Sequence, residues 1–322
     1  MTTTALLDEV RDSAAWVAAL ARSVEIRRER LPSYAAELTA MPRFEPTIDS
    51  RYHYLGQGDG TVAFILCLDA INFGSGWFRW LIERPGLGGY FTVAVSLKEW
   101  FEDNGSPTAG DLTAIDAERC ARIFGQVEAP DQIGELMEHF AGAWHELGRF
   151  LLDRFEGDFV SLVAAAGGSA ERLVAILREM SFFDDVAVYE DRPVPLFKRA
   201  QLAAVDLALA FSGEGPGRFD DLERLTIFAD NQVPQVLRAD GVLEYAPSLA
   251  DRVARGEELA RNSPEEVEIR ACTVHAVELL KVELEKLGSP RAAWELDQLL
   301  WHRGLGLDAG TSPAHRTLTV FY

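Results

Sequence analysis

A single acid stands inside an apolar run at residues 225–237. The run reads Leu-Thr-Ile-Phe-Ala-Asp-Asn-Gln-Val-Pro-Gln-Val-Leu, and Asp230 is its only ionisable side chain. Burying a carboxylate costs free energy unless the group is paired or reactive, and enzymes prepare acids for chemistry in such surroundings. Asp230 is therefore the first candidate for a catalytic residue. The alternative interpretation is that Asp230 caps the helix entered through Pro234, because Asp and Asn favour helix starts.

A second acid, Asp297, lies between two tryptophans near the C-terminus. The spacing of Trp294, Asp297 and Trp301 places them on one side of a predicted helix, and His302 follows directly. Aromatic walls beside an acid suit a flat polar heterocycle. In the alternative interpretation the aromatic residues belong to the core and the acid lies on the surface.

Basic residues open a predicted apolar helix at Phe197-Lys-Arg-Ala-Gln201. Backbone N–H groups at a helix start also face outward, so Lys198 and Arg199 indicate an anion or phosphate site. Alternatively, the two basic residues only solvate the helix end.

The segments that resemble metal-binding or cofactor-binding motifs are incomplete. The segment His145-Glu-Leu-Gly-Arg149 begins like a zinc-protease helix, but Arg149 stands where the second histidine ligand belongs. His139 lies six residues before His145, which places the two on different faces of a helix. The glycine clusters lack the strand and helix of a dinucleotide-binding turn. The three cysteines are widely separated, which favours a reducing compartment over disulfides or zinc. We expect neither a metal nor a cofactor.

Composition restricts the partners. Among 322 residues, 51 acidic side chains outnumber 31 basic ones, giving a net charge of -20. Such a charge repels polyanions, so we expect no extended nucleic-acid surface. No apolar run approaches the roughly 20 residues that cross a bilayer, and the N-terminus lacks the pattern of a secretory signal. A cytoplasmic monomer that does not contact membranes is expected.

The fold class is predicted to be mainly α, as one compact domain over residues 1–322 with a few short strands. Apolar residues recur at helical spacing, Ser263-Pro264 starts one helix and Gly304 ends the last. Strand-like alternation is brief. The run 62–68 fits a buried strand, but its continuation favours a buried helix. The predicted helices are 6–17, 133–151, 173–180, 196–211, 267–287 and 292–301, and the predicted strands are 90–95, 186–189 and 317–321.

Five sequence blocks together resemble the queuosine salvage protein family. They occur in the expected order and span nearly the whole chain. The resemblance implies a queuosine 5′-phosphate N-glycosylase, which hydrolyses this small nucleotide to queuine and ribose 5-phosphate so that queuine is salvaged for tRNA modification. It also implies a fold similar to helix-hairpin-helix DNA glycosylases. The blocks are Leu68-Asp-Ala-Ile-Asn-Phe73, Phe197-Lys-Arg-Ala-Gln201, the run 225–237, Glu268-Ile-Arg-Ala-Cys272 and Leu296-Asp-Gln-Leu-Leu-Trp301.

Site residues follow from the matched positions. The resemblance implies that Asp230 is the catalytic aspartate and that Phe228, Asp297 and His53 line the base pocket. At His302 the chain departs from the family, whose members tend to carry an acid there, and His302 is itself a candidate substrate-binding residue.

Further roles follow from the substrate that the resemblance implies. Asn72 and His53 are candidates to assist the departing base, and Trp301 to enclose its ring. Lys198 is our choice for the 5′-phosphate, with Arg199 or Arg270 next in line.

Two other functions stay open from the sequence. A helical binding protein could use Asp230 only to hydrogen-bond a nucleotide or modified base. A glycosylase acting on a flipped base of a nucleic acid is a third interpretation, against which the charge of -20 counts.

Overall fold

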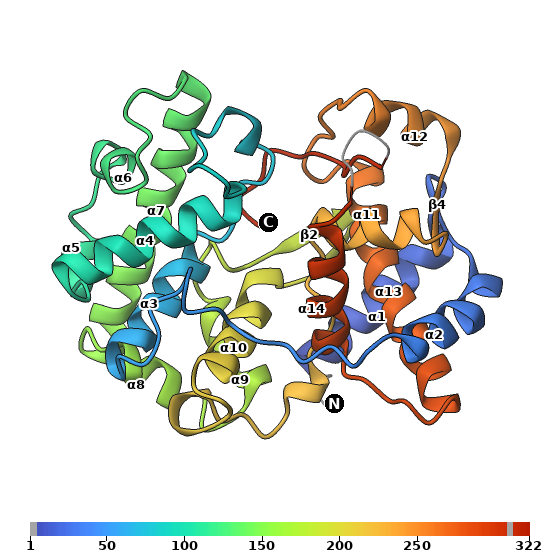
Figure 1. Cartoon of the computed structure of the whole chain (residues 1–322), viewed down its shortest axis with the longest axis horizontal. Helices are drawn as coiled ribbons and strands as arrows, with labels where there is room; N and C mark the ends of the chain where they lie inside the picture. The colour runs from blue at the N-terminus through green and yellow to red at the C-terminus, as the bar shows by residue number, and fades with distance from the viewer. Residues whose placement is uncertain (1–4, 308–311) are drawn as a thin grey trace. The chain divides into compact units, whose positions relative to one another are not determined.

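The computed structural model of the protein describes residues 5–307 and 312–322, and it confirms the prediction of a mainly helical chain with a few short strands (Figure 1). The chain packs into two compact units. Unit 1 comprises residues 1–46, 185–198 and 221–318, and unit 2 comprises residues 47–184, 199–220 and 319–322. The single domain over residues 1–322 and the likeness to helix-hairpin-helix glycosylases stay predictions.

Unit 1 is built around one long helix, α13, which begins as the sequence predicted. The Ser263 side chain accepts a hydrogen bond from the Glu266 N–H, and Pro264 takes the first turn, where its missing N–H costs nothing. The helices α1, α2, α11 and α14 pack against α13. The helices of unit 1 are α1 (Leu6–Leu20), α2 (Leu31–Ala40), α11 (Gln232–Ala239), α12 (Pro247–Ala254), α13 (Pro264–Lys286) and α14 (Ala293–Gly304), with short 3-10 helices at Arg28–Arg30 and Leu222–Arg224.

Two small antiparallel sheets complete unit 1. Strand β1 (Val24–Ile26) pairs with β4 (Leu243–Tyr245). Strand β2 (Val186–Tyr189), which the sequence predicted, pairs with β3 (Arg192–Pro195). The two residues between β2 and β3 both have positive φ, at 45° and 61°. Positive φ at both central positions is the geometry of the tight turns that match the twist of a two-stranded hairpin.

The helices of unit 2 surround α7, a 25-residue helix. Its buried residues recur at helical spacing, as predicted, and the helices α3, α5, α6 and α8 pack against it. The helices of unit 2 are α3 (Asp59–Ala70), α4 (Gly89–Asn104), α5 (Ala109–Leu112), α6 (Ala117–Ile123), α7 (Asp131–Phe155), α8 (Phe159–Ala164), α9 (Ala170–Leu177) and α10 (Lys198–Ala210, whose first residue belongs to unit 1), with short 3-10 helices at Phe78–Trp80 and Gly215–Gly217.

Two predicted strands are wrong. Residues 90–95 lie in α4, because Val93, Leu97 and Phe101 form a buried helical face that outweighs the β propensity of the segment. Residues 317–321 alternate between buried and half-buried positions as a strand would. Among the residues that the structure describes, however, no neighbouring strand pairs with them, so they form extended chain next to a single bridge between Glu258 and Arg316. The run 62–68 belongs to helix α3, as favoured.

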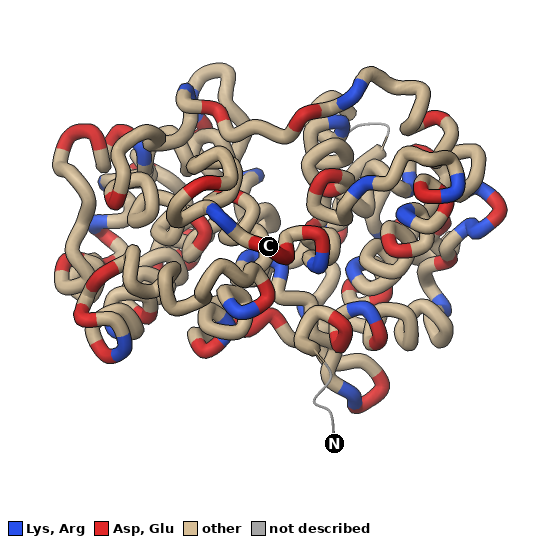
Figure 2. The backbone as a smooth tube through the Cα atoms, turned by 90° about the horizontal axis from the view of Figure 1, so that it is seen from below, with Lys and Arg blue, Asp and Glu red and all other residues tan. Residues whose placement is uncertain are grey.

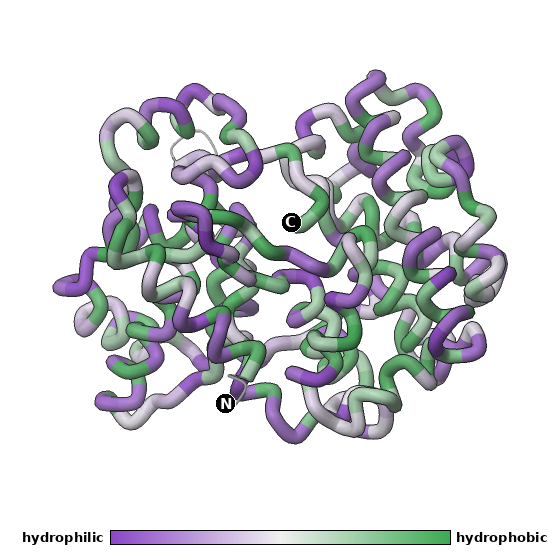
Figure 3. The backbone as a smooth tube through the Cα atoms, turned by 180° about the vertical axis from the view of Figure 1, so that it is seen from behind, coloured by the Kyte–Doolittle hydropathy of each residue, from purple (hydrophilic) through white to green (hydrophobic). Residues whose placement is uncertain are grey.

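The surface pattern agrees with the composition. Lys and Arg are scattered among the more numerous Asp and Glu (Figure 2), and hydrophobic and hydrophilic stretches are interspersed along the chain (Figure 3). Within residues 5–307 and 312–322, no helix has the length and apolar character needed to span a bilayer.

Candidate functional site

The segment 225–230 of unit 1 is buried although it has no regular secondary structure. Buried backbone polar groups need partners, and here two side chains supply them. The Phe228 N–H donates to the Asp297 carboxyl at 2.9 Å, and the Ala229 carbonyl accepts from Nε of Arg270 at 2.9 Å. Helices α13 and α14 therefore hold the chain immediately before Asp230.

Asp230 is a buried acid and a helix cap at once. Its side chain is only 8% exposed, and Oδ1 accepts the N–H groups of Gln232 at 2.8 Å and Val233 at 3.0 Å, where α11 begins. The capping interpretation is therefore confirmed, and the catalytic role of Asp230 stays a prediction. Burial raises the pKa of the carboxyl above its ordinary value, while the charges of Lys198 and Arg270 and the two N–H groups oppose that rise.

Asp297 is the second buried acid of this site, and it lies on α14. Burial raises its pKa well above the ordinary value, and the negative charge of Asp230 raises it further. The Phe228 N–H and Lys198 act in the opposite direction. The negative charge of Asp230 therefore disfavours ionisation of Asp297, and of the two acids Asp297 holds its proton to the higher pH.

Lys198 is the basic group of the site, and it begins α10 as predicted. It is 7% exposed, and its charge lowers the pKa of both acids. Its backbone N–H donates to the carboxylate of Asp185 at 3.2 Å. The preceding residue, Phe197, is fully buried and has a φ of 49°, which a non-glycine side chain rarely adopts. The structure thus brings together four predicted residues, which we call the acid cluster: Lys198, Phe228, Asp230 and Asp297.

Two further predicted residues lie on α14, and their surroundings differ. Trp301 is half-buried, and its carbonyl accepts from the Gln232 side chain at 2.8 Å, which ties α14 to the start of α11. His302 is exposed; its Nδ1 lies 2.7 Å from the carbonyl of Gln298 on the same helix, and its ring centroid lies 5.0 Å from that of Phe44. The roles of Trp301 and His302 in substrate binding stay predictions.

The remaining predicted residues, His53 and Asn72, belong to unit 2. His53 is buried, and its Nδ1 lies 2.9 Å from the carbonyl of Asp49, which can only accept. The other ring nitrogen then accepts the Tyr90 hydroxyl at 2.9 Å. Burial lowers the pKa of His53, so its ring is neutral. Asn72 is half-buried and donates to Asp69 at 3.3 Å. Their roles toward a base also stay predictions.

The two alternative candidates for binding the phosphate both form hydrogen bonds within the protein. Arg199, in unit 2, is 1% exposed and donates to the backbone carbonyls of Asp69, Ala70, Phe182 and Val320. Arg270, in unit 1, is 2% exposed and forms two hydrogen bonds to Asp185, at 3.0 and 2.6 Å. Lys198 stays our choice for a phosphate as a prediction.

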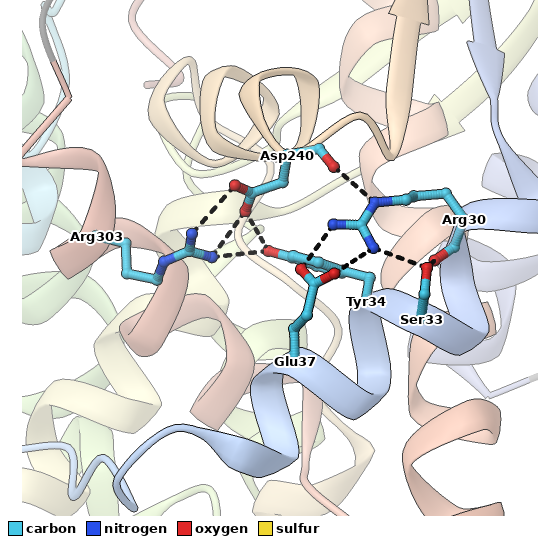
Figure 4. Close-up of polar contacts among 6 residues, drawn as sticks. All are labelled: Arg30, Ser33, Tyr34, Glu37, Asp240 and Arg303. Carbon is cyan, nitrogen blue, oxygen red and sulfur yellow. Dashed lines mark hydrogen bonds and ion pairs between the residues drawn. The ribbon is translucent and has the colours of Figure 1, made fainter.

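A polar group that the sequence did not reveal fixes α2, α11 and α14 of unit 1 against one another. The carboxylate of Asp240, at the end of α11, accepts from the Tyr34 hydroxyl at 2.6 Å and from Arg303 of α14 at 2.7 and 3.1 Å (Figure 4). Arg30 donates to the carbonyl of Asp240 at 3.0 Å. Only the pairing of residues far apart in the chain makes this group, so no local pattern could have revealed it.

The acid cluster offers defined chemistry. An ionised carboxylate can stabilise a developing cation, a protonated one can donate a hydrogen bond, and a lysine can pair with an anion. Over the ranges that the structure describes, no three His, Cys, Asp or Glu side chains are placed to hold a metal ion.

Comparisons with known proteins place the chain in a family. The sequence model of the queuosine salvage protein family matches residues 52–322. A Sphaerobacter thermophilus protein named queuosine 5′-phosphate N-glycosylase/hydrolase is 42% identical over 94% of either chain. Proteins of the same name from Dictyostelium discoideum and Mus musculus are 31% and 29% identical, each over 97% of this chain and 98% of its own length. With a match of this extent, the chain belongs to the queuosine salvage protein family.

Proposed function

We propose that the protein hydrolyses the N-glycosidic bond of queuosine 5′-phosphate and releases queuine and ribose 5-phosphate. The observation that carries the proposal is the buried carboxyl of Asp230, which interacts with the cation of Lys198 and with Asp297, the acid that holds its proton to the higher pH. The names of the relatives support the choice of substrate. The expected setting is a cytoplasmic monomer that acts on the free nucleotide.

Asp230 acts on the sugar in this proposal. Loss of a base from ribose passes through an oxocarbenium-like state, with positive charge near C1′ and negative charge leaving with the base. A fixed carboxylate next to C1′ stabilises the positive charge. The two N–H groups on Oδ1 hold the side chain still, and its other oxygen is then directed at C1′ or at the attacking water.

Asp297 and Phe228 act on the base. Queuine is a 7-deazaguanine, so it lacks the ring nitrogen that is usually protonated when a purine departs. Donors must instead assist the polar edge that remains, and a protonated Asp297 is such a donor. The amine on queuine's cyclopentenediol arm is cationic, and its approach would favour the ionised form of the same carboxyl. Phe228 and Trp301 supply aromatic surface, and His53 and Asn72 are the proposed residues from unit 2.

Lys198 takes the 5′-phosphate. It is the first residue of the 13-residue helix α10, and its ammonium can pair with a phosphate. Lys198 also favours the ionised form of Asp230. Substrate binding and readiness of the catalytic acid therefore depend on one cation.

Product release tests the proposal. Purified protein is incubated with queuosine 5′-phosphate, and the mixture is separated by chromatography. We expect free queuine and ribose 5-phosphate in equal amounts. Recovery of intact, bound nucleotide after prolonged incubation would identify a binding protein instead. Release of queuine from intact tRNA, but not from the nucleotide, would identify a nucleic-acid glycosylase.

A further inference from the structure

One buried guanidinium connects the chain segment that carries Asp230 with the segment that leads to Lys198. Arg270 lies on α13, and its Nε donates to the carbonyl of Ala229, the residue before Asp230, at 2.9 Å. Its two terminal nitrogens donate to both oxygens of Asp185, at 3.0 and 2.6 Å. Arg270 and Asp185 are each about 2% exposed, so water does not compete for these bonds.

Asp185 in turn holds the segment that leads into α10. Its carbonyl accepts the N–H groups of Leu196 at 2.9 Å and Phe197 at 3.2 Å, and its carboxylate accepts the N–H of Lys198 at 3.2 Å. Phe197 has the left-handed backbone conformation noted above, which costs roughly 1–2 kcal/mol and persists only where the surroundings impose it. Three successive N–H groups on Asp185 impose it here and so direct the start of α10.

We propose that Arg270 and Asp185 are positioning residues that set the separation between the Asp230 carboxylate and the Lys198 ammonium. The Arg270–Asp185 pair makes hydrogen bonds to the chain beside each reacting group, and the charge of Arg270 also favours the ionised form of Asp230. The pair holds the backbone next to each of these groups, at Ala229 and at Phe197–Lys198. Because a nucleotide presents its 5′-phosphate and C1′ at a fixed distance, this separation decides whether both contacts form in one bound substrate. The inference rests on the proposed function.

A second ion pair of unit 1 supplies the matched control. Arg303 and Asp240 also form two hydrogen bonds across long sequence separation, at 2.7 and 3.1 Å. That pair joins α14 to the far end of α11, and both side chains also hydrogen-bond the Tyr34 hydroxyl of α2. Its side chains are 30% and 19% exposed. Substitution of this pair therefore tests the effect of lower stability without a change in the positions of Asp230 and Lys198.

The experiment compares Arg270→Lys, Asp185→Asn and Arg303→Lys with wild type, using queuosine 5′-phosphate hydrolysis for kcat and KM and calorimetry for queuine binding. Lysine keeps the charge but cannot hold Ala229 and both oxygens of Asp185 together. Asn keeps the size and the acceptor oxygen for Lys198 but loses the ion pair. Misplacing a reacting group by about 1 Å can cost about 100-fold in rate. For Arg270→Lys and Asp185→Asn we expect kcat to fall by about 100-fold, while the affinity for queuine stays within about threefold of wild type. For Arg303→Lys we expect kcat to stay within about threefold of wild type.

Three results would overturn the inference. In the first, a folded Arg270→Lys or Asp185→Asn protein keeps kcat within about threefold of wild type. In the second, kcat falls equally in Arg303→Lys, and in the third, the affinity for queuine falls in proportion to kcat. If Arg270→Lys does not fold, the outcome for Asp185→Asn decides. Failure of the proposed function gives a different result, because wild type itself would then release no queuine.

Discussion

The two buried acids of unit 1 differ in how the protein holds them. Asp230 accepts two backbone N–H groups at the start of α11, and the charges of Lys198 and Arg270 favour its ionised form. Asp297 accepts one N–H group, from Phe228, and the charge of Asp230 works against its ionisation. Despite similar burial, Asp297 therefore holds its proton to a higher pH than Asp230.

This difference divides the chemistry. A reaction that develops positive charge on a sugar and negative charge on a departing base needs a carboxylate for the first and a donor for the second. In the function proposed above, the same side-chain type supplies both because its neighbours differ. We therefore propose that Asp230 acts on the sugar and Asp297 on the base, and each of the following changes tests one part of that proposal.

The largest effect is expected from Asp230→Asn. Asn keeps the oxygen that caps α11 but carries no charge, so the oxocarbenium-like state loses its stabilisation. We expect kcat to fall by about four orders of magnitude, as for other essential catalytic groups, while the Kd for queuosine 5′-phosphate changes by less than about threefold. Single-turnover assays of queuine release and equilibrium binding give the two numbers. Turnover like that of wild type would remove Asp230 from its assigned role.

The next effect concerns Asp297 and the identity of the base. Asp297→Asn retains an acceptor for Phe228 but can neither pair with the cationic arm of queuine nor give up a proton. A lost hydrogen bond to a charged group costs about 1.5–3 kcal/mol, so we expect binding of queuosine 5′-phosphate to weaken by roughly 10- to 100-fold. Binding of guanosine 5′-phosphate, which has no such arm, should weaken much less. Calorimetric titration with both nucleotides measures this, and equal losses would contradict the role.

A smaller and more selective effect is expected from Lys198→Ala. The variant should lose the preference for queuosine 5′-phosphate over unphosphorylated queuosine, because the ammonium that pairs with the phosphate is gone. The matched variant Lys198→Arg should keep part of the preference. The ratio of kcat/KM for the two substrates is the measurement, and an unchanged ratio in Lys198→Ala would place the phosphate elsewhere.

The smallest effect is on stability, and its sign follows from the raised pKa of Asp297. Above the ordinary pKa of 3.8 the unfolded chain loses this proton, but the folded protein keeps it up to a higher pH. The folded state therefore binds more protons in that window, and the free energy of unfolding falls as pH rises, by at most about 1.4 kcal/mol per pH unit. Asp297→Asn cannot lose a proton, so its stability should fall less steeply.

Urea unfolding at several pH values from about 4 upward checks this slope. Asp230→Asn is the matched control. Either substitution removes the repulsion between the two acids, so the two variants differ in the remaining causes of the pKa shifts. The opposing charges of Lys198 and Arg270 limit the rise in the pKa of Asp230, so Asp230→Asn should change the slope less. A larger change for Asp230→Asn than for Asp297→Asn would reverse our assignment of charge between the two acids.

Local patterns predicted the parts of the molecule that depend on local physics. The Ser263 cap, the end of α14 at Gly304 and the buried position of Asp230 were all visible in the sequence, because each depends on residues within one or two turns. Residues 90–95 misled us, since short β-branched and aromatic alternation also fits a helix whose buried face continues beyond it.

The long-range ion pairs of unit 1 were not predictable from the sequence. Asp185 and Arg270 are 85 positions apart, and Asp240 and Arg303 are 63 apart. Nothing within one helical turn of either residue marks its partner. From the sequence alone, Arg270 is only a possible phosphate-binding residue, because nothing in the sequence distinguishes one isolated basic residue from another. The fold alone makes it a buried link between Ala229 and Asp185.

A crystal structure of the Asp230→Asn variant with intact queuosine 5′-phosphate tests the central claim most directly. The account predicts C1′ of the nucleotide within about 3.5 Å of the side chain at position 230, or one water away from it, with the base against Asp297 and the phosphate at Lys198. A nucleotide bound with its C1′ remote from position 230 would contradict the account.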